Sequence, residues 1–205
     1  IPRAPSTSNV AYQNEHRSCA FFRDCYYALL NYFGQQVRYS GRKFRFRNAA
    51  YALDSTVITL CAKVYDWARY THAKGAVRLH TLLNFHTMLP EFVHITDGKT
   101  GDNTVARNVE VKPGSIVVCD RGYFDTLLMK FWDSIKVFFI VRVKGNLIYE
   151  RIEERDLPDN THQEVLIDEV VRLTGNGTSG QYPKNIRRIA VYNAEHHFTM
   201  VLLTN

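Results

Sequence analysis

The sequence predicts an α/β fold in which helices flank a mixed sheet and a β-rich segment follows that sheet. Strand-like runs at residues 49–58, 76–85 and 90–96 follow one another, and a short turn near 86–89 joins the last two, which is typical of antiparallel neighbours. Runs at 115–119 and 137–143 are separated by a helix-like segment, which is typical of a parallel crossover. A sheet with both kinds of neighbour is mixed.

Residues 1–48 are predicted to form a basic lead-in with helical and extended parts. Prolines, serines and an asparagine predict an extended or irregular start over residues 1–16. Apolar residues then recur at helical spacing from Ser18 to about Phe33. Residues 41–47 alternate aromatic and basic side chains, which predicts a strand or an extended arm.

Residues 49–144 carry the strands and helices of the predicted core. A turn at 97–99 and a short helix at 103–108 follow the first three strands. The compact apolar run at 115–119 predicts a buried strand that ends at Asp120. A helix over 124–132 and a β-prone run at 137–143 complete this core.

Residues 145–205 differ in character from the core. Short β-like pieces at 147–149, 165–167, 189–192 and 199–203 alternate with charged or Gly/Asn-rich stretches. We interpret this part as a β-rich insertion or subdomain.

The composition is that of an ordinary globular protein, with 45% hydrophobic and 22% charged residues. No apolar run approaches the roughly 18 residues that span a bilayer, so we expect no membrane association. The chain starts with Ile-Pro-Arg and lacks a signal segment, so we expect a piece of a longer cytoplasmic protein. The spacing of the four cysteines fits neither a zinc site nor a disulfide framework, which predicts buried free thiols in a reducing compartment.

The net charge of +6 is concentrated in the first quarter of the chain. Residues 1–50 contain eight Lys/Arg and two acidic residues, so the remainder holds 26 − 8 = 18 basic and 20 − 2 = 18 acidic residues. A basic segment beside a neutral body favours a polyanionic partner such as DNA. A solvated basic surface would give the same numbers.

The alternation at 41–47 has two interpretations. It can form a ribbon whose basic side chains contact DNA phosphates, or an edge segment that docks Phe44 and Phe46 into the core. The basic side chains of this candidate DNA-binding ribbon are Arg42, Lys43, Arg45 and Arg47.

Two aspartates are the candidate catalytic residues. Asp54 lies within a predicted strand and Asp120 ends another, although aspartate is disfavoured in strands. Two carboxylates at neighbouring strand ends can bind two divalent cations, the arrangement that stabilises both oxygens of a phosphodiester displacement. The alternative is that each aspartate only caps a turn or a helix.

Four short segments carry a resemblance to a known family. They read Leu53-Asp54-Ser55-Thr56, Lys74-Gly75-Ala76-Val77-Arg78-Leu79-His80-Thr81, Val93-His94-Ile95-Thr96-Asp97-Gly98-Lys99 and Asp120-Arg121-Gly122-Tyr123. With the lead-in at 11–17 and the ending at 201–205, they resemble bacterial insertion-sequence transposases of the insertion-sequence-four family. The resemblance covers essentially the whole chain, and its motifs are specific in combination.

The resemblance implies a ribonuclease-H-like catalytic domain with a β-rich insertion before its final catalytic helix. It also implies two aspartates and a glutamate that bind two Mg²⁺ or Mn²⁺ ions. Asp54 and Asp120 match the aspartates, Asp54 holding both ions and Asp120 one of them. The glutamate pattern, Y-x2-R-x3-E-x6-K, has no match, because Tyr149, Arg151 and Glu154 have the wrong spacing. We therefore expect the chain to stop before that glutamate and to be inactive by itself.

Further polar residues near these motifs have two interpretations each. Lys99 and Arg121 can contact DNA phosphates near the metal ions or form ordinary ion pairs. His80 and His94 lack the spacing of a zinc motif and are expected to be hydrogen-bonded near the sheet end.

The leading functional hypothesis is a metal-dependent DNA transposase that cleaves and transfers the strands of a mobile element. Its expected partners are the terminal inverted repeats, target DNA and further copies of itself, in the cytoplasm and on the nucleoid when bound to DNA. The alternatives are a ribonuclease-H-like nuclease without strand transfer and a non-catalytic DNA-binding remnant.

Overall fold

The computed structural model describes residues 4–36, 46–60, 75–157, 164–175 and 182–205. The chain divides into two compact units, Ile1–Gly41 and Arg42–Asn205. The first unit contains α1 (Thr7–His16) and α2 (Cys19–Gln36), neither of which has a buried residue. The helix predicted from Ser18 is confirmed. The extended start is wrong for α1, because the Ser6 hydroxyl caps this helix by accepting a hydrogen bond from the Asn9 N–H.

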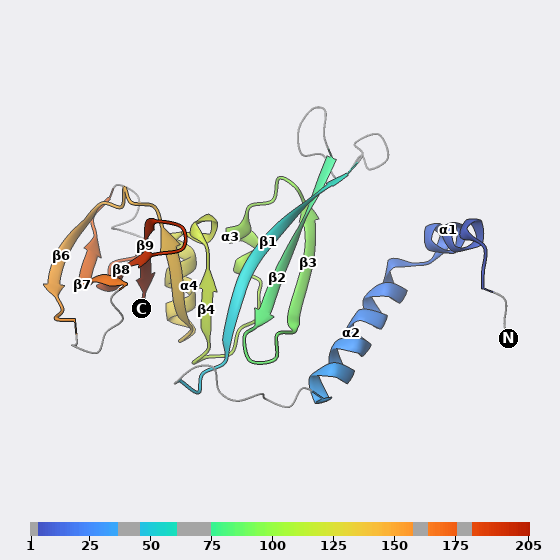
Figure 1. Ribbon diagram of the computed structural model, residues 1–205, viewed down its shortest axis with the longest axis horizontal. Helices are drawn as coiled ribbons and strands as arrows, with labels where there is room; N and C mark the ends of the chain where they lie inside the picture. The colour runs from blue at the N-terminus through green and yellow to red at the C-terminus, as the bar shows by residue number, and fades with distance from the viewer. Residues whose placement is uncertain (1–3, 37–45, 61–74, 158–163, 176–181) are drawn as a thin grey trace. The chain divides into compact units, whose positions relative to one another are not determined.

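The second unit is built on one sheet, whose described strands have the order β3-β2-β1-β4-β5-β9-β8-β7-β6 (Figure 1). These strands are β1 (Ala50–Leu60), β2 (Gly75–Asn84), β3 (Pro90–Asp97), β4 (Ile116–Cys119), β5 (Phe138–Val143), β6 (Tyr149–Glu154), β7 (Val165–Leu173), β8 (Ile186–Asn193) and β9 (Phe198–Thr204). Strands β1, β2 and β3 are antiparallel neighbours, whereas β1, β4 and β5 are parallel neighbours. The predicted α/β class, with a mixed sheet flanked by helices, is confirmed, whereas its likeness to ribonuclease H stays a prediction.

Three helical elements connect the core strands: α3 (Asp102–Ala106), the 3₁₀ turn η2 (Arg121–Tyr123) and α4 (Thr126–Ser134). They lie against one face of the sheet, where the buried side chains of α4 are Thr126, Leu128, Met129 and Trp132. Alternate residues of β4 and β5 point into the same core, so Val117 and Phe139 are fully buried. Burying each such apolar side chain contributes about 1.5–3 kcal/mol to the free energy of unfolding, relative to leaving it exposed.

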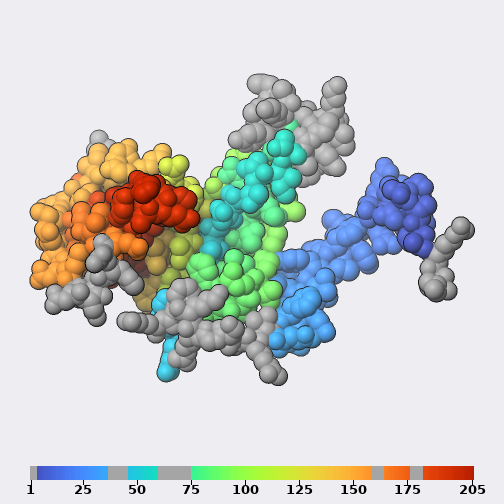
Figure 2. Space-filling view, in the orientation of Figure 1, coloured from blue at the N-terminus to red at the C-terminus, as the bar shows by residue number. Residues whose placement is uncertain are grey.

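The opposite face of these strands is covered less completely. Ala52, Val118 and Ile140, which alternate with core residues, remain partly exposed. In the space-filling view, the atoms of β1 lie at the surface on the side turned away from α3 and α4 (Figure 2). One face of β1, β4 and β5 is thus packed against helices, and the other is accessible in this chain.

The β-like pieces of residues 145–205 lengthen into four strands that continue the same sheet. Strand β9 pairs antiparallel with β5, with Val141 opposite Leu203. Strands β8, β7 and β6 follow in antiparallel order. Two ion pairs join β7 to β8, Arg187 Nη2–Asp168 Oδ2 at 2.5 Å and Arg188 Nη1–Glu169 Oε1 at 2.6 Å. The division into a core at 49–144 and an insertion at 145–205 stays a prediction.

The expectations about membrane-spanning segments and cysteines had different outcomes. No helix in the described part of the chain is long and apolar enough to cross a bilayer. Cys119 is a buried free thiol as predicted, but Cys19 and Cys25 are exposed, because the helix that carries them has no buried side. Cys61 lies outside the described residues.

Candidate active site

The pairing of β1 with β4 brings the two predicted catalytic aspartates together. The last registered pair of these parallel strands is Leu53 with Cys119, so Asp54 and Asp120 are the next residues along each strand. Neighbouring strands lie about 4.8 Å apart, and adjacent residues of parallel strands project to the same face. Because Leu53 and Cys119 point into the core, both aspartates point to the accessible face, where they are exposed.

Each aspartate uses one oxygen for a local hydrogen bond. The Ser55 N–H donates to Asp54 Oδ1 at 2.8 Å, and the Gly122 N–H donates to Asp120 Oδ1 at 2.8 Å. Asp120 thereby caps η2. Within the described part of the chain, no Lys or Arg pairs with either carboxylate, which leaves Oδ2 of each available to a ligand.

This donor set fits a hard divalent cation. Mg²⁺ is typically bound through one or two carboxylates, with water and substrate phosphates completing its octahedron. The described residues contain no group of three or more His, Cys, Asp or Glu arranged around one metal position. A cation held by Asp54 and Asp120 would therefore need further ligands, such as water or substrate phosphates.

A third carboxylate, Asp102, lies behind this pair and was missed in the sequence. Asp102 is the first residue of α3, and its Oδ1 accepts hydrogen bonds from Ser55 Oγ at 2.7 Å and from Arg78 Nη1 at 2.8 Å. His80 Nδ1 lies 3.6 Å from the same oxygen. The sequence predicted the helix to begin one residue later. An acidic residue at a helix start was the available signal, but that signal alone indicates only a helix terminus.

His80 is a buried, neutral part of this group. Its side chain is 0% exposed, and its Nε2 lies 3.0 Å from Thr96 Oγ1. Burial lowers the pKa of His80 below its ordinary value and outweighs the opposing effect of the Asp102 carboxylate. The expected hydrogen bond of His80 is confirmed, but its expected place near the sheet end is wrong, because His80 lies in the interior of β2, opposite Ser55 and His94.

Two aromatic residues near the site belong to the core. Tyr123 and Trp132 are each 1% exposed. Burial raises the pKa of Tyr123, and the Asp102 and Asp54 carboxylates add to this rise. Both side chains therefore pack in the core and are not open to a stacking base.

The predicted DNA-binding residues occupy different places. Arg121 directly follows Asp120, whereas Lys99 follows the end of β3, which is level with Ile58 and not with Asp54; both are exposed. Arg47 is exposed but precedes the amino ends of β1 and β4, at the opposite end of the sheet. The other three, Arg42, Lys43 and Arg45, lie outside the described residues.

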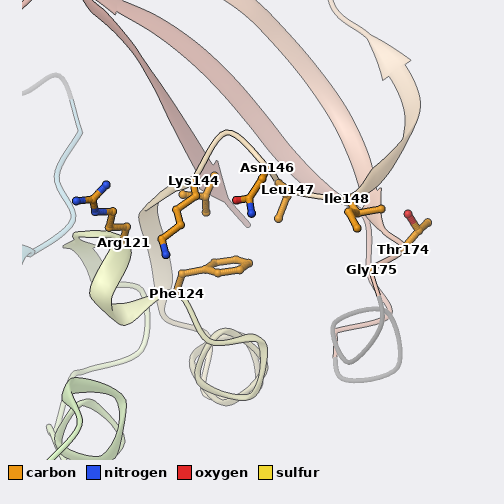
Figure 3. A pocket seen from close by; sticks show the side chains of 9 residues that line it. Arg121, Phe124, Lys144, Asn146, Leu147, Ile148, Thr174 and Gly175 are labelled. Carbon is orange, nitrogen blue, oxygen red and sulfur yellow. The ribbon is translucent and has the colours of Figure 1, made fainter.

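A cavity of about 590 Å³ opens beside the Asp120 turn. Figure 3 shows the Lys144 side chain directed toward the ring of Phe124, with Asn146 and Leu147 on the opposite wall and the Arg121 guanidinium directed outward. Neither Arg121 nor Lys144 forms an ion pair with a described residue. Their two charges are therefore available to an anionic ligand.

Glu154, whose surroundings partly match the glutamate pattern, is remote from Asp54 and Asp120. Glu154 ends β6, the outermost strand of the sheet, where it forms an exposed ion pair with Arg151. Five strand spacings separate β6 from β4, or about 24 Å. The structure thus supports the conclusion from spacing that Glu154 does not complete the site.

A family model described as "Transposase DDE domain" matches residues 46–202. A Sinorhizobium fredii protein named "Putative transposase y4zB" is 27% identical over 209 residues, covering 100% of this chain and 56% of the relative. The "Probable transposase for insertion sequence element IS5377" of Geobacillus stearothermophilus is 23% identical over 168 residues, covering 82% of this chain and 44% of the relative. The chain thus spans about half the length of these curated relatives.

A solved structure of the piggyBac transposase synaptic complex with hairpin DNA shares 11% sequence identity, with a TM-score of 0.42. The match covers 78% of this chain and 33% of that chain.

Proposed function

The chain belongs to the transposase DDE domain family, and on that premise we propose that it forms the catalytic core of a bacterial DNA transposase. The proposed reaction is divalent-metal-dependent cleavage of a phosphodiester at the end of a mobile element, followed by transfer of the freed 3′-hydroxyl to target DNA. The observation that carries this proposal is the parallel register that sets Asp54 beside Asp120 on one accessible face. Assignment to the insertion-sequence-four group stays a prediction.

Asp54 and Asp120 are the proposed ligands of two Mg²⁺ or Mn²⁺ ions. Bound there, the ions would activate the attacking oxygen and stabilise the leaving oxygen. The chain contributes by fixing its ligands: the Ser55 and Gly122 amides each hold one carboxylate oxygen, which leaves the other free for metal. No protein nucleophile is required in this scheme.

Arg121 and Lys144 are the proposed DNA contacts near the aspartates, and Lys99 is proposed to contact DNA further away, beyond the end of β3. Arg121 and Lys144 line the cavity beside Asp120, and because neither pairs with a described acidic residue, their charges suit a phosphate backbone. Arg42, Lys43, Arg45 and Arg47 are proposed to contact DNA away from the metal ions, and joining two element ends implies a homo-oligomer. We propose that the third carboxylate comes from a part of the protein outside these 205 residues, so that this piece alone does not cut DNA.

The proposal is tested in the full-length protein with a labelled element end. Asp54→Ala is expected to reduce cleavage to background while DNA affinity changes by less than about twofold, because Asp54 contacts metal rather than base edges. The matched control Asp156→Ala removes an exposed acid remote from the site and should leave both quantities unchanged. Retained cleavage in Asp54→Ala would overturn the assignment.

A pre-cleaved element end separates the transposase from its alternatives. A transposase joins the free 3′-hydroxyl to target DNA, a nuclease only cuts, and a binding remnant does neither. Joined product that requires Mg²⁺ or Mn²⁺ and Asp120 is the expected result.

A further inference from the structure

We propose that Asp102 is a positioning residue that holds Asp54 and Asp120 in register for metal binding. The inference rests on the proposed metal site and adds to it a residue from the opposite side of the sheet. Three sets of contacts place Asp102 where it can fix both aspartates without contacting the metal ions itself.

The first contact fixes β1 at Asp54. Ser55 directly follows Asp54, and its hydroxyl donates to Asp102 Oδ1 at 2.7 Å, while its N–H donates to Asp54 Oδ1. Successive residues of a strand point to opposite faces, so Ser55 is anchored on the helix side while Asp54 projects to the other. Holding Ser55 therefore sets the direction of the Asp54 side chain.

The second observation places Asp102 close to the turn that carries Asp120. A Cβ atom on Gly122 would lie 3.0 Å from Asp120 Oδ1 and 3.4 Å from Asp102 Oδ2. The two carboxylate oxygens are therefore at most 3.0 + 3.4 = 6.4 Å apart. The absence of a side chain at Gly122 permits this approach of Asp102 to the Asp120 turn.

The third contact balances the charge of Asp102. Arg78 and Asp102 are only 19% and 17% exposed, and Arg78 Nη1 donates to Asp102 Oδ1 at 2.8 Å. Within the described part of the chain, Arg78 Nε and His80 Nδ1 are buried without a hydrogen-bond acceptor. Asp102 is thus the acid that compensates this group, and its Oδ1 is occupied by donors instead of being open to a metal ion.

Residues that orient metal ligands commonly change metal affinity by about 10- to 100-fold when substituted. The test measures Mn²⁺ binding to the full-length protein by electron paramagnetic resonance and calorimetry, which requires no cleavage activity. Asp102→Asn is expected to weaken Mn²⁺ binding by about tenfold or more. Asp133→Asn is the matched control, because Asp133 lies in α4, is 20% exposed and pairs with Lys184, and we expect less than about twofold change.

Ser55→Ala distinguishes positioning from loss of charge. This variant keeps every charge but removes the hydrogen bond to Asp102, so weaker Mn²⁺ binding, by about threefold or more, supports a role through geometry. Amide NMR signals provide a readout without metal: Asp102→Asn should shift the Gly122 and Ser55 N–H resonances, whereas Asp133→Asn should not.

Asp54→Ala separates failure of this inference from failure of the proposed function. If Asp54→Ala does not weaken Mn²⁺ binding, the metal site itself is wrong. If Asp54→Ala abolishes binding but both Asp102→Asn and Ser55→Ala bind Mn²⁺ normally, only the positioning role is overturned. Should Asp102→Asn fail to fold, the affinity of the folded Ser55→Ala variant decides.

Discussion

Replacing Asp54 with asparagine should stabilise the metal-free protein. Asp54 and Asp120 project from neighbouring strand positions about 5 Å apart, and no described cation pairs with them. Two charges at 5 Å repel by about 0.8 kcal/mol at the dielectric constant of water and by about 3.3 kcal/mol at an effective value of 20. Because both side chains are exposed, the lower figure applies, so Asp54→Asn should raise the free energy of unfolding by about 1 kcal/mol.

The substitution is suited to this measurement because asparagine retains Oδ1, which accepts the Ser55 N–H. Urea unfolding in EDTA at 10 mM and at 1 M NaCl measures the effect. The screening length falls from about 30 Å to about 3 Å between these conditions, so the gain should fall by more than half. The control Asp156→Asn, at an exposed acid remote from the pair, should change stability by less than about 0.5 kcal/mol.

Mn²⁺ should reverse the order of the two proteins. The ion binds the folded aspartate pair and stabilises the wild type by mass action, whereas Asp54→Asn lacks one of the two ligands. A loss of stability in Asp54→Asn without metal, or a gain that persists in 1 M salt, would refute the reasoning that the two carboxylates face one another.

Two further predictions concern buried ionisable side chains. The pKa of His80 lies below its ordinary value, so the unfolded chain binds a proton first as the pH falls below about 6.5. The free energy of unfolding should therefore fall from pH 7.5 to pH 5.5, and His80→Gln should remove this loss. Equal pH slopes of the free energy of unfolding in wild type and His80→Gln would contradict the prediction. Arg188→Met leaves Glu169, 4% exposed, without its partner and should cost about 3 kcal/mol in urea unfolding, whereas Glu169→Leu/Arg188→Met should cost less than half as much.

The proposed active site depends on one face of the sheet and its support on the other. Asp54 and Asp120 face outward where metal and DNA can reach them, while Ser55, Arg78 and Asp102 form a polar group on the helix side. Burying a group of polar side chains lowers the stability of the fold unless these side chains form hydrogen bonds or ion pairs with one another. The arrangement explains why charged residues occur on the otherwise apolar side of β1 and β2.

Local patterns in the sequence determined the elements of the core and the candidate aspartates. Apolar periodicity located β1 to β5 to within a few residues, because side-chain alternation and helical spacing are properties of short segments. Asp54 and Asp120 stood out because aspartate is disfavoured in strands and because their flanking motifs resemble those of transposases. The same local reasoning missed α1, where a single Ser6 cap offset the turn-forming composition.

Only the tertiary structure decided which residues meet. Ser55 and Asp102 are 47 positions apart, and the pairing of β9 with β5 joins Leu203 to Val141, so neither contact is encoded in a short window. Register between distant strands follows from burying one face of the whole sheet, a condition that involves all strands at once. For this reason the sequence identified two acids on two strands, whereas the fold set them side by side and placed Asp102 behind them.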